Sequence, residues 1–274
     1  MSLKQNTTSY GRFKGAPWFS KLADSMILIG GAGSIGSNVA FQLARTGADI
    51  VIVDNDNVGI ENLAGQMYGP AQIGKTKVEA IAEVIVSLCE KPTITPINEL
   101  VVPGDGQWLS ILPTADVVIV GFDNLPARKV MYEEWRKNGK DISLFIDGRL
   151  SMENGEIYVL EKRDLPEVFE GYEKTYFSPE EREELPCTMK STTHCGMILA
   201  GLIVANITNW LNNQDDRYLP RDISNFRFYL ELMKIDKPSL VTPRPGIVVT
   251  AEEPTKAEVE DENEPAVLGR PESI

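Results

Sequence analysis

Histidine, cysteine and positive charge are all scarce in this sequence. The 274 residues include one histidine and three cysteines, and 27 lysines and arginines stand against 40 acidic residues, a formal net charge of −13. Three widely spaced cysteines do not make a disulfide framework, so we expect a reducing, cytoplasmic setting. The excess of negative charge disfavours general binding to a phosphate backbone, so we expect no nucleic-acid partner.

Long apolar runs are missing as well. No stretch reaches the roughly 20 apolar residues that span a bilayer. The chain begins with MSLKQNTTSYGRFKG, which lacks the apolar segment of a secretory signal. We therefore expect neither secretion nor an association with membranes.

The C-terminal stretch is acidic. Residues 251–274 contain no aromatic residue and no apolar periodicity. This composition predicts a disordered tail that either keeps the protein soluble or docks a partner. Ahead of the tail we expect one domain over residues 25–250, preceded by an N-terminal arm over residues 1–24.

Apolar runs alternate with helix-like segments through the first part of the domain. Short, continuous apolar runs bounded by glycines are typical of buried parallel strands. The expected strands are residues 25–30, 49–54, 93–98, 116–120 and 143–147, and the expected helices are residues 34–46, 75–90 and 126–138. This alternation predicts an α/β fold with a doubly wound, mostly parallel, Rossmann-like sheet.

The pattern changes after residue 148. Residues 155–160 indicate a strand of the antiparallel type, and residues 225–235 indicate a final strand or hairpin. Residues from about 163 to 190 are polar and interrupted by prolines, which predicts a long crossover loop. Residues 195–211 form a strongly apolar helix that we expect in a core or at a subunit interface.

The segment GAGSIG joins the first expected strand to the first expected helix. Gly31 allows the tight turn, Gly33 lets a phosphate approach the backbone, and Gly36 lets the helix pack close to the sheet. The helix then offers free N–H groups to an anion. Such turns also occur without a ligand, but the order of strand, loop and helix favours nucleotide binding.

Acidic and basic side chains follow the next strand. Asp54 ends that strand and is suited to ribose hydroxyls, as in sites for either ATP or NAD. Asp56 either supports the site or is solvated. Lys75 and Lys77 lie near a helix start, where the helix dipole disfavours cations. A bound phosphate would offset this, although two solvated surface lysines are the alternative.

Asp123 and Asn124 follow the strand at residues 116–120. They should lie at the carboxyl edge of the sheet, where doubly wound folds bind ligands. A carboxylate there could hold Mg²⁺ that bridges phosphates. Either residue could instead cap the following helix, so one of them could do each job. Together with the lysines, these residues favour ATP over NAD.

The order of these motifs resembles the ubiquitin-activating enzyme superfamily. The matching segments are GAGSIG, the DNDNVGIENLAGQ stretch, IGKTK, and the Asp-Asn pair followed by Arg128. The resemblance extends over about residues 25–211 and includes ThiF-, MoeB- and HesA-type adenylyltransferases. It implies binding of ATP and Mg²⁺ and adenylation of the C-terminal carboxylate of a small ubiquitin-like or sulfur-carrier protein.

Roles of individual residues follow from this resemblance. It implies that Asp54 holds the ribose, that Asn62 and Gln66 lie near the phosphates, that Lys77 contacts phosphate, and that Asp123 binds Mg²⁺. Asn124 is a further candidate for binding the cofactor. The family habit, together with the apolar helix, also implies a homodimer.

Cys187 lies at the end of the expected crossover loop, in LPCTMK. Members of the family that form a thioester place a nucleophilic cysteine in this loop. Cys187 is therefore either a catalytic nucleophile or an ordinary half-buried thiol. Cys89 and Cys195 are expected to pack in the core, and His194 either makes a structural hydrogen bond or acts beside Cys187.

The sequence departs from the family pattern at three places. Gly65 stands where many members have arginine, and the family's N-terminal arginine motif is not evident, so Arg12 and Arg128 are candidate substitutes. The paired CxxC motifs that bind zinc are missing, and we predict no zinc. The lost arginines leave open a non-catalytic nucleotide-binding protein, and the glycine loop alone also permits an NAD-dependent oxidoreductase.

Overall fold

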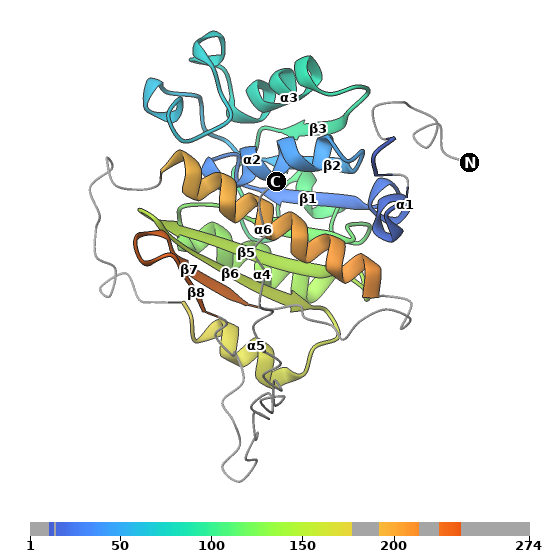
Figure 1. The fold of residues 1–274 in the computed structure, drawn as a ribbon. Coiled ribbons are helices and arrows are strands. Elements are labelled where there is room, and N and C mark those ends of the chain that lie inside the picture. The colour runs from blue at the N-terminus through green and yellow to red at the C-terminus, as the bar shows by residue number, and fades with distance from the viewer. Residues whose placement is uncertain (1–10, 14, 177–191, 214–224, 237–274) are drawn as a thin grey trace, which may run out of the picture. The chain divides into compact units, whose positions relative to one another are not determined.

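The computed structural model describes residues 11–13, 15–176, 192–213 and 225–236. Within these residues an eight-stranded sheet has the strand order β3-β2-β1-β4-β5-β6-β7-β8 (Figure 1). The strands are β1 (Met26–Gly30), β2 (Asp49–Val53), β3 (Thr93–Ile97), β4 (Val117–Val120), β5 (Leu144–Ser151), β6 (Asn154–Glu161), β7 (Phe226–Tyr229) and β8 (Lys234–Asp236). Strands β1 to β5 pair in parallel, and β6, β7 and β8 extend the sheet in antiparallel pairs. The predicted fold class is confirmed.

Helices cover both faces of this sheet. They are α1 (Pro17–Ala23), α2 (Ser34–Ala44), α3 (Lys77–Leu88), α4 (Leu125–Asn138), α5 (Pro166–Glu173) and α6 (Thr193–Asn212). Successive strand side chains point to opposite faces. Ile27 and Ile29 therefore pack in the core with α2, α3 and α6, whereas Leu28 and Phe145 pack in the core with α4 and α5.

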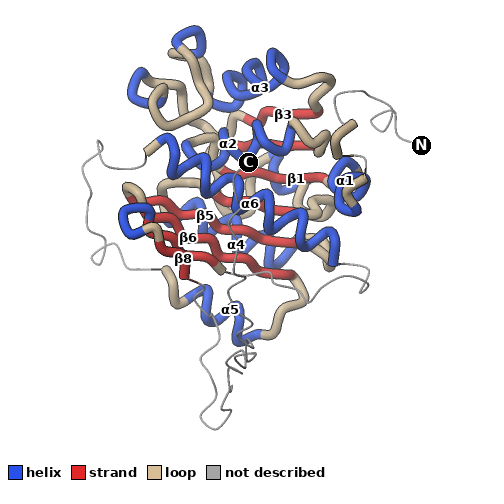
Figure 2. Tube along the Cα trace, in the orientation of Figure 1, coloured by secondary structure: helices blue, strands red, loops and turns tan. Residues whose placement is uncertain are grey.

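Helix α6 runs beside α2 across one face of the sheet, as Figures 1 and 2 both show. Its hydropathy and its 20-residue length would suit a membrane span, but half of the tested window is buried inside the described fold. Core residues of α6 include Leu199, Ile203 and Ile207, while Met197 and Ile198 are exposed. The apolar helix predicted over 195–211 is thus present, and one of its sides packs in the core.

Each strand and helix predicted between residues 25 and 160 is present, with ends shifted by up to four residues. Two short α-helices in the described residues were not predicted. Residues 166–173, within the stretch expected as a crossover loop, form α5, because Phe169 and Tyr172 lie one turn apart and are buried. Pro17 begins α1 in the expected N-terminal arm. Most of the remaining crossover segment and the acidic tail lie outside the described residues, and the domain limits stay predictions.

The carboxyl ends of β1 and β4 lie side by side. β1 continues into Gly31 and β4 into Gly121, and the Gly121 N–H donates to the Gly30 carbonyl at 2.8 Å. From β1 the chain proceeds to β2 and β3 on one side, and from β4 it proceeds to β5 on the other. Doubly wound folds bind ligands at such a switch point, so the topology places the candidate crevice here.

Candidate functional site

The glycine loop between β1 and α2 is tightly packed on one side and open on the other. Gly31 has a φ of +93°, in the left-handed region that favours glycine. A Cβ on Gly36 would lie 1.8 Å from the Gly31 carbonyl oxygen, so α2 packs directly on the turn. A Cβ on Gly33 would meet no atom within 4 Å. The loop is therefore accessible at Gly33, next to the α2 start.

Replacing Gly36 by alanine is expected to lower the free energy of unfolding by about 1–3 kcal/mol, because the added methyl overpacks a backbone contact. Alanine at Gly33 meets open space in extended backbone, so a loss below about 1 kcal/mol is expected from the weaker helix cap. Urea denaturation of the two variants measures the difference. Equal losses in both would contradict the packing argument.

Asp54 joins the end of β2 to the glycine loop. Its side chain is buried, Oδ2 accepts from the Ala32 N–H at 2.7 Å, and Oδ1 accepts from the Asp56 N–H at 2.8 Å. A carboxylate offers about four lone-pair sites. Both Asp54 oxygens are thus fixed by backbone donors and can still accept from a sugar hydroxyl.

Tyr68 links the glycine loop to the start of α3, although no sequence motif pointed to it. Its hydroxyl donates to the Ala32 carbonyl at 2.6 Å and lies 3.3 Å from the Lys77 carbonyl. Burial raises the pKa of the Tyr68 phenol well above its ordinary value, and the negative charges of Asp54 and Asp56 add to this. The hydroxyl therefore stays protonated as a donor. The only signal in the sequence was a tyrosine among polar loop residues.

The two lysines of IGKTK have different surroundings. Lys77 is the first residue of α3, and its Nζ lies 2.8 Å from Asp56 Oδ2, with the lysine side chain 11% exposed and the aspartate side chain 63% exposed. Lys75 instead pairs with Glu83 at 2.6 Å on the surface, and this bond lowers the pKa of Glu83. Lys77 is therefore the lysine of this pair that is held inside the fold, next to Asp56, while Lys75 is a surface residue, and the role of Lys77 toward phosphate stays a prediction.

Gln66 carries an unsatisfied polar atom. Its Oε1 is buried and has no hydrogen-bond partner among the described residues. Leaving a buried acceptor unpaired costs about 1–3 kcal/mol, so a ligand that donates there would be stabilised. Asn62, one turn earlier, instead uses its Oδ1 to accept from the Gly59 N–H at 2.8 Å. Of the two residues predicted near the phosphates, Gln66 is therefore the one whose side-chain oxygen lacks a hydrogen-bond donor among the described residues.

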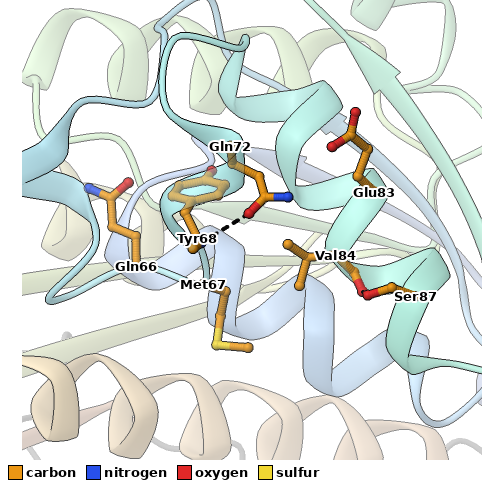
Figure 3. Close-up of a pocket in the computed structure, with 8 residues that line it drawn as sticks. Gln66, Met67, Tyr68, Gln72, Glu83, Val84 and Ser87 are labelled. Atoms are coloured by element: carbon orange, nitrogen blue, oxygen red, sulfur yellow. Dashed lines mark hydrogen bonds between the residues drawn. The ribbon is translucent and has the colours of Figure 1, made fainter.

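A cavity of about 580 Å³ lies beside Gln66, between the loop at residues 66–72 and α3 (Figure 3). Met67 and Val84 supply apolar surface, and Gln72 supplies a polar group that accepts from the Gly69 N–H. The cavity lining does not include the glycine loop, Asp54 or Asp123. It is thus a neighbour of the crevice rather than the crevice itself.

Asn124 performs one of the two tasks predicted for the pair Asp123 and Asn124, the capping of α4. Asn124 Oδ1 accepts from the Ala127 N–H at 2.9 Å and so caps α4. Asp123 is exposed at the end of β4, just after the junction with β1. No group of three or more metal-ligating side chains occurs in the described part of the chain. Mg²⁺ commonly uses one or two carboxylates with substrate phosphates and water, so Asp123 fits that ion.

The two arginines expected as substitutes have different surroundings. Arg128 is buried, and its Nη1 donates to Asp147 and, at 2.9 Å, to the Gly148 carbonyl. Arg12 is exposed near the beginning of the described residues. The Asp147 cluster was missed because its members are distant in sequence. Its one local signal was an aspartate and an arginine ending the apolar strand LFIDGR.

The start of α6 lies against the loop that carries Gly65. The Thr193 hydroxyl donates to the Ala64 carbonyl, and the Ser34 hydroxyl donates to the Gly65 carbonyl at 2.8 Å. A Cβ on Gly196 would lie 2.5 Å from the Ser34 Oγ. The starts of α2 and α6 therefore meet at the position where an arginine was expected.

The described cysteines are buried or packed against the core, whereas the histidine is exposed. Cys195 is buried in the core, and burial raises the pKa of its thiol to about 11, so it is a packing residue and a poor nucleophile. Cys89 packs against the same core. His194 is exposed, with Nε2 3.3 Å from Glu153 Oε1. Cys187 lies outside the described residues, and its catalytic role stays a prediction.

Known proteins resemble this chain in sequence. The profile of the ThiF family matches residues 7–243. Molybdopterin-synthase adenylyltransferase of Escherichia coli is 30% identical over 109 residues, which cover 39% of this chain and 43% of the relative. The tRNA threonylcarbamoyladenosine dehydratase of Escherichia coli is 28% identical over 138 residues, which cover 49% of this chain and 51% of the relative. The matches thus span about half or less of these relatives.

Solved structures resemble it in fold. The crystal structure of Escherichia coli MccB with ATP superposes with a TM-score of 0.64 at 17% identity, and the match covers 89% of this chain and 75% of MccB. At this level of identity the likeness concerns the fold alone.

Proposed function

The chain belongs to the ThiF family, and from that premise we propose that it is an ATP-dependent adenylyltransferase. Its substrate is the C-terminal carboxylate of a small ubiquitin-like or sulfur-carrier protein, or of a peptide. The observation that carries the proposal is the bonded unit of glycine loop, Asp54, Tyr68 and Lys77. This unit supports the proposal because a carboxylate suited to ribose, the start of α2 and the segment that carries Lys77 are bonded to one accessible loop.

The proposed reaction begins with an ionised carboxylate and needs no general base. A carboxylate oxygen of the acceptor attacks the α-phosphorus of ATP, the bond from that phosphorus to the bridging oxygen breaks, and pyrophosphate leaves with the electron pair. Lys77 and the N–H groups at the start of α2 neutralise charge on the phosphates. Mg²⁺, held by Asp123 when bound, would supply further charge neutralisation on the leaving group.

A protein or peptide acceptor is favoured over RNA. One relative is named for a modified tRNA nucleoside, so family members are not confined to protein acceptors. This chain, however, has a formal net charge of −13, which opposes binding to a phosphate backbone. Later transfer to Cys187, a homodimer and a cytoplasmic location belong to the same proposal. The partly exposed apolar side of α6 is consistent with a dimer contact.

Calorimetric titration of the full chain tests the choice of ligand. We expect saturable binding of ATP with Mg²⁺ and no binding of NAD⁺ or NADH, because Lys77 and Asp123 suit a triphosphate. Binding of a dinucleotide without ATP would replace the proposal with an oxidoreductase. If ATP bound but AMP were never transferred to any protein or peptide ending in glycine, the non-catalytic alternative would stand.

A further inference from the structure

A buried carboxylate on β5, beside the candidate crevice, joins three elements. Asp147 has no exposed surface, and its Oδ1 accepts from Arg128 of α4. Its Oδ2 accepts from Arg149 Nε at 2.8 Å and from the Tyr172 hydroxyl of α5 at 3.0 Å. A buried charge must be paired because isolated burial is strongly unfavourable. The two oxygens therefore serve different neighbours, one facing α4 and one facing β5 and α5.

The Oδ2 side of Asp147 is held firmly. The Arg149 guanidinium also donates to the Thr175 carbonyl at 3.0 Å and to the Thr175 hydroxyl at 2.9 Å. It lies over the Tyr158 ring, 4.6 Å from the ring centre. Cation–π contacts and several fixed acceptors leave this guanidinium little freedom. Asp147 is thus held by contacts that do not involve Arg128.

The Oδ1 side fixes the beginning of α4. Arg128 lies in the first turns of this helix and donates from Nη1 to both Asp147 and the Gly148 carbonyl. Asn124 caps the same helix, and Asp123 precedes the cap. The Arg128 contacts therefore hold the first turn of α4, which follows Asp123 and its neighbour Asn124 directly in the chain.

We propose that Asp147 is a positioning residue that acts on Asp123 through Arg128. The inference rests on the proposed function, because it takes Asp123 as the residue that binds Mg²⁺. Packing alone does not require this cluster, since well-packed apolar residues often replace a buried ion pair without loss of stability. The charges instead give α4 one defined position, and that position is useful where a metal ligand must be placed closely.

Titration of the full chain with ATP at several Mg²⁺ concentrations tests this inference. Arg128→Lys keeps the positive charge but cannot donate to Asp147 and Gly148 with the geometry of a guanidinium. We expect about tenfold weaker binding of ATP with Mg²⁺, equivalent to about 1.4 kcal/mol. Lys129→Ala is the matched control, because Lys129 makes an exposed 3.7 Å pair with Glu133 on the same helix. It should leave the affinity unchanged.

A double-mutant cycle separates positioning from a general loss of structure. In the Asp123→Asn background, Arg128→Lys should have no further effect, because its influence passes through Asp123. Additive effects, or an unchanged affinity in Arg128→Lys alone, would overturn the inference. If Arg128→Lys does not fold, Tyr172→Phe replaces it in the cycle, since it keeps the ring and removes one donor to Oδ2; about threefold weaker binding is then expected.

The cycle also distinguishes the inference from its premise. If Asp123→Asn alone leaves the Mg²⁺ dependence of ATP binding unchanged, Asp123 is not the metal ligand and both claims fail. A second outcome separates the claims. If Asp123→Asn abolishes that dependence, but Arg128→Lys still weakens ATP binding in the Asp123→Asn background, the metal role stands and the positioning role of Asp147 fails.

Discussion

Lys77→Ala is expected to weaken binding of ATP with Mg²⁺ by about one to two orders of magnitude. The variant removes a largely buried ammonium at the start of α3, and a lost bond to a charged group costs about 1.5–3 kcal/mol. The partner that remains, Asp56, is 63% exposed, so water can solvate it and the free energy of unfolding should change little. Calorimetric titration and urea denaturation measure the two quantities.

Lys75→Ala is the matched control for this prediction. Lys75 is two residues away and has the same charge, but its Nζ bonds to Glu83 on the surface. Exposed pairs of this kind contribute about 0–1 kcal/mol, so neither stability nor ATP affinity should change much. Equal loss of affinity in both variants would show that general positive charge attracts the nucleotide and that Lys77 has no specific contact.

Asp123→Ala is expected to abolish AMP transfer, a fall of at least about 10³-fold, and to remove the effect of Mg²⁺ on ATP binding. Asp123 is exposed at the end of β4, and Asn124 rather than Asp123 has its side chain on the α4 cap, so the fold should survive. Titration with and without Mg²⁺ checks the binding, and detection of AMP transferred to the acceptor checks the chemistry.

Asn124→Ala shows whether loss of the helix cap could mimic that result. This variant keeps the Asp123 carboxylate but removes the bond to the Ala127 N–H, at an expected cost of about 1 kcal/mol in stability. Its Mg²⁺ dependence should match that of the parent protein. Unchanged AMP transfer in Asp123→Ala would exclude Asp123 from the mechanism.

Local patterns predicted the parts of the site that depend on short stretches of chain. The glycine loop and Asp54 follow from a strand, a turn and a helix, each encoded by adjacent residues. The Asn124 cap was likewise foreseen as one of two options, because the side-chain oxygen of a polar residue before a helix can accept from an N–H of the first turn. The roles predicted for these residues toward a ligand remain predictions.

Other features depended on contacts that no local pattern encodes. Lys75 and Lys77 differ in environment because Thr76 caps α3, which puts one lysine before the helix and the other inside it. Sequence alone could not fix that boundary to a single residue. Arg128 was a candidate phosphate ligand until the fold brought it to Asp147, 19 positions later. Helix α5 was not recognised in the sequence because its apolar face consists of just two buried aromatic residues.

β5 is longer than β4 at the carboxyl edge of the sheet. β4 ends at Val120, opposite Asp147, while β5 continues for four residues to Ser151, paired there with β6. At about 3.3 Å per residue, β5 therefore extends about 13 Å beyond the end of β4. The carboxyl edge of the sheet is therefore uneven beside Asp123: it is low over β1 and β2, whose ends are level with the end of β4, and high over β5.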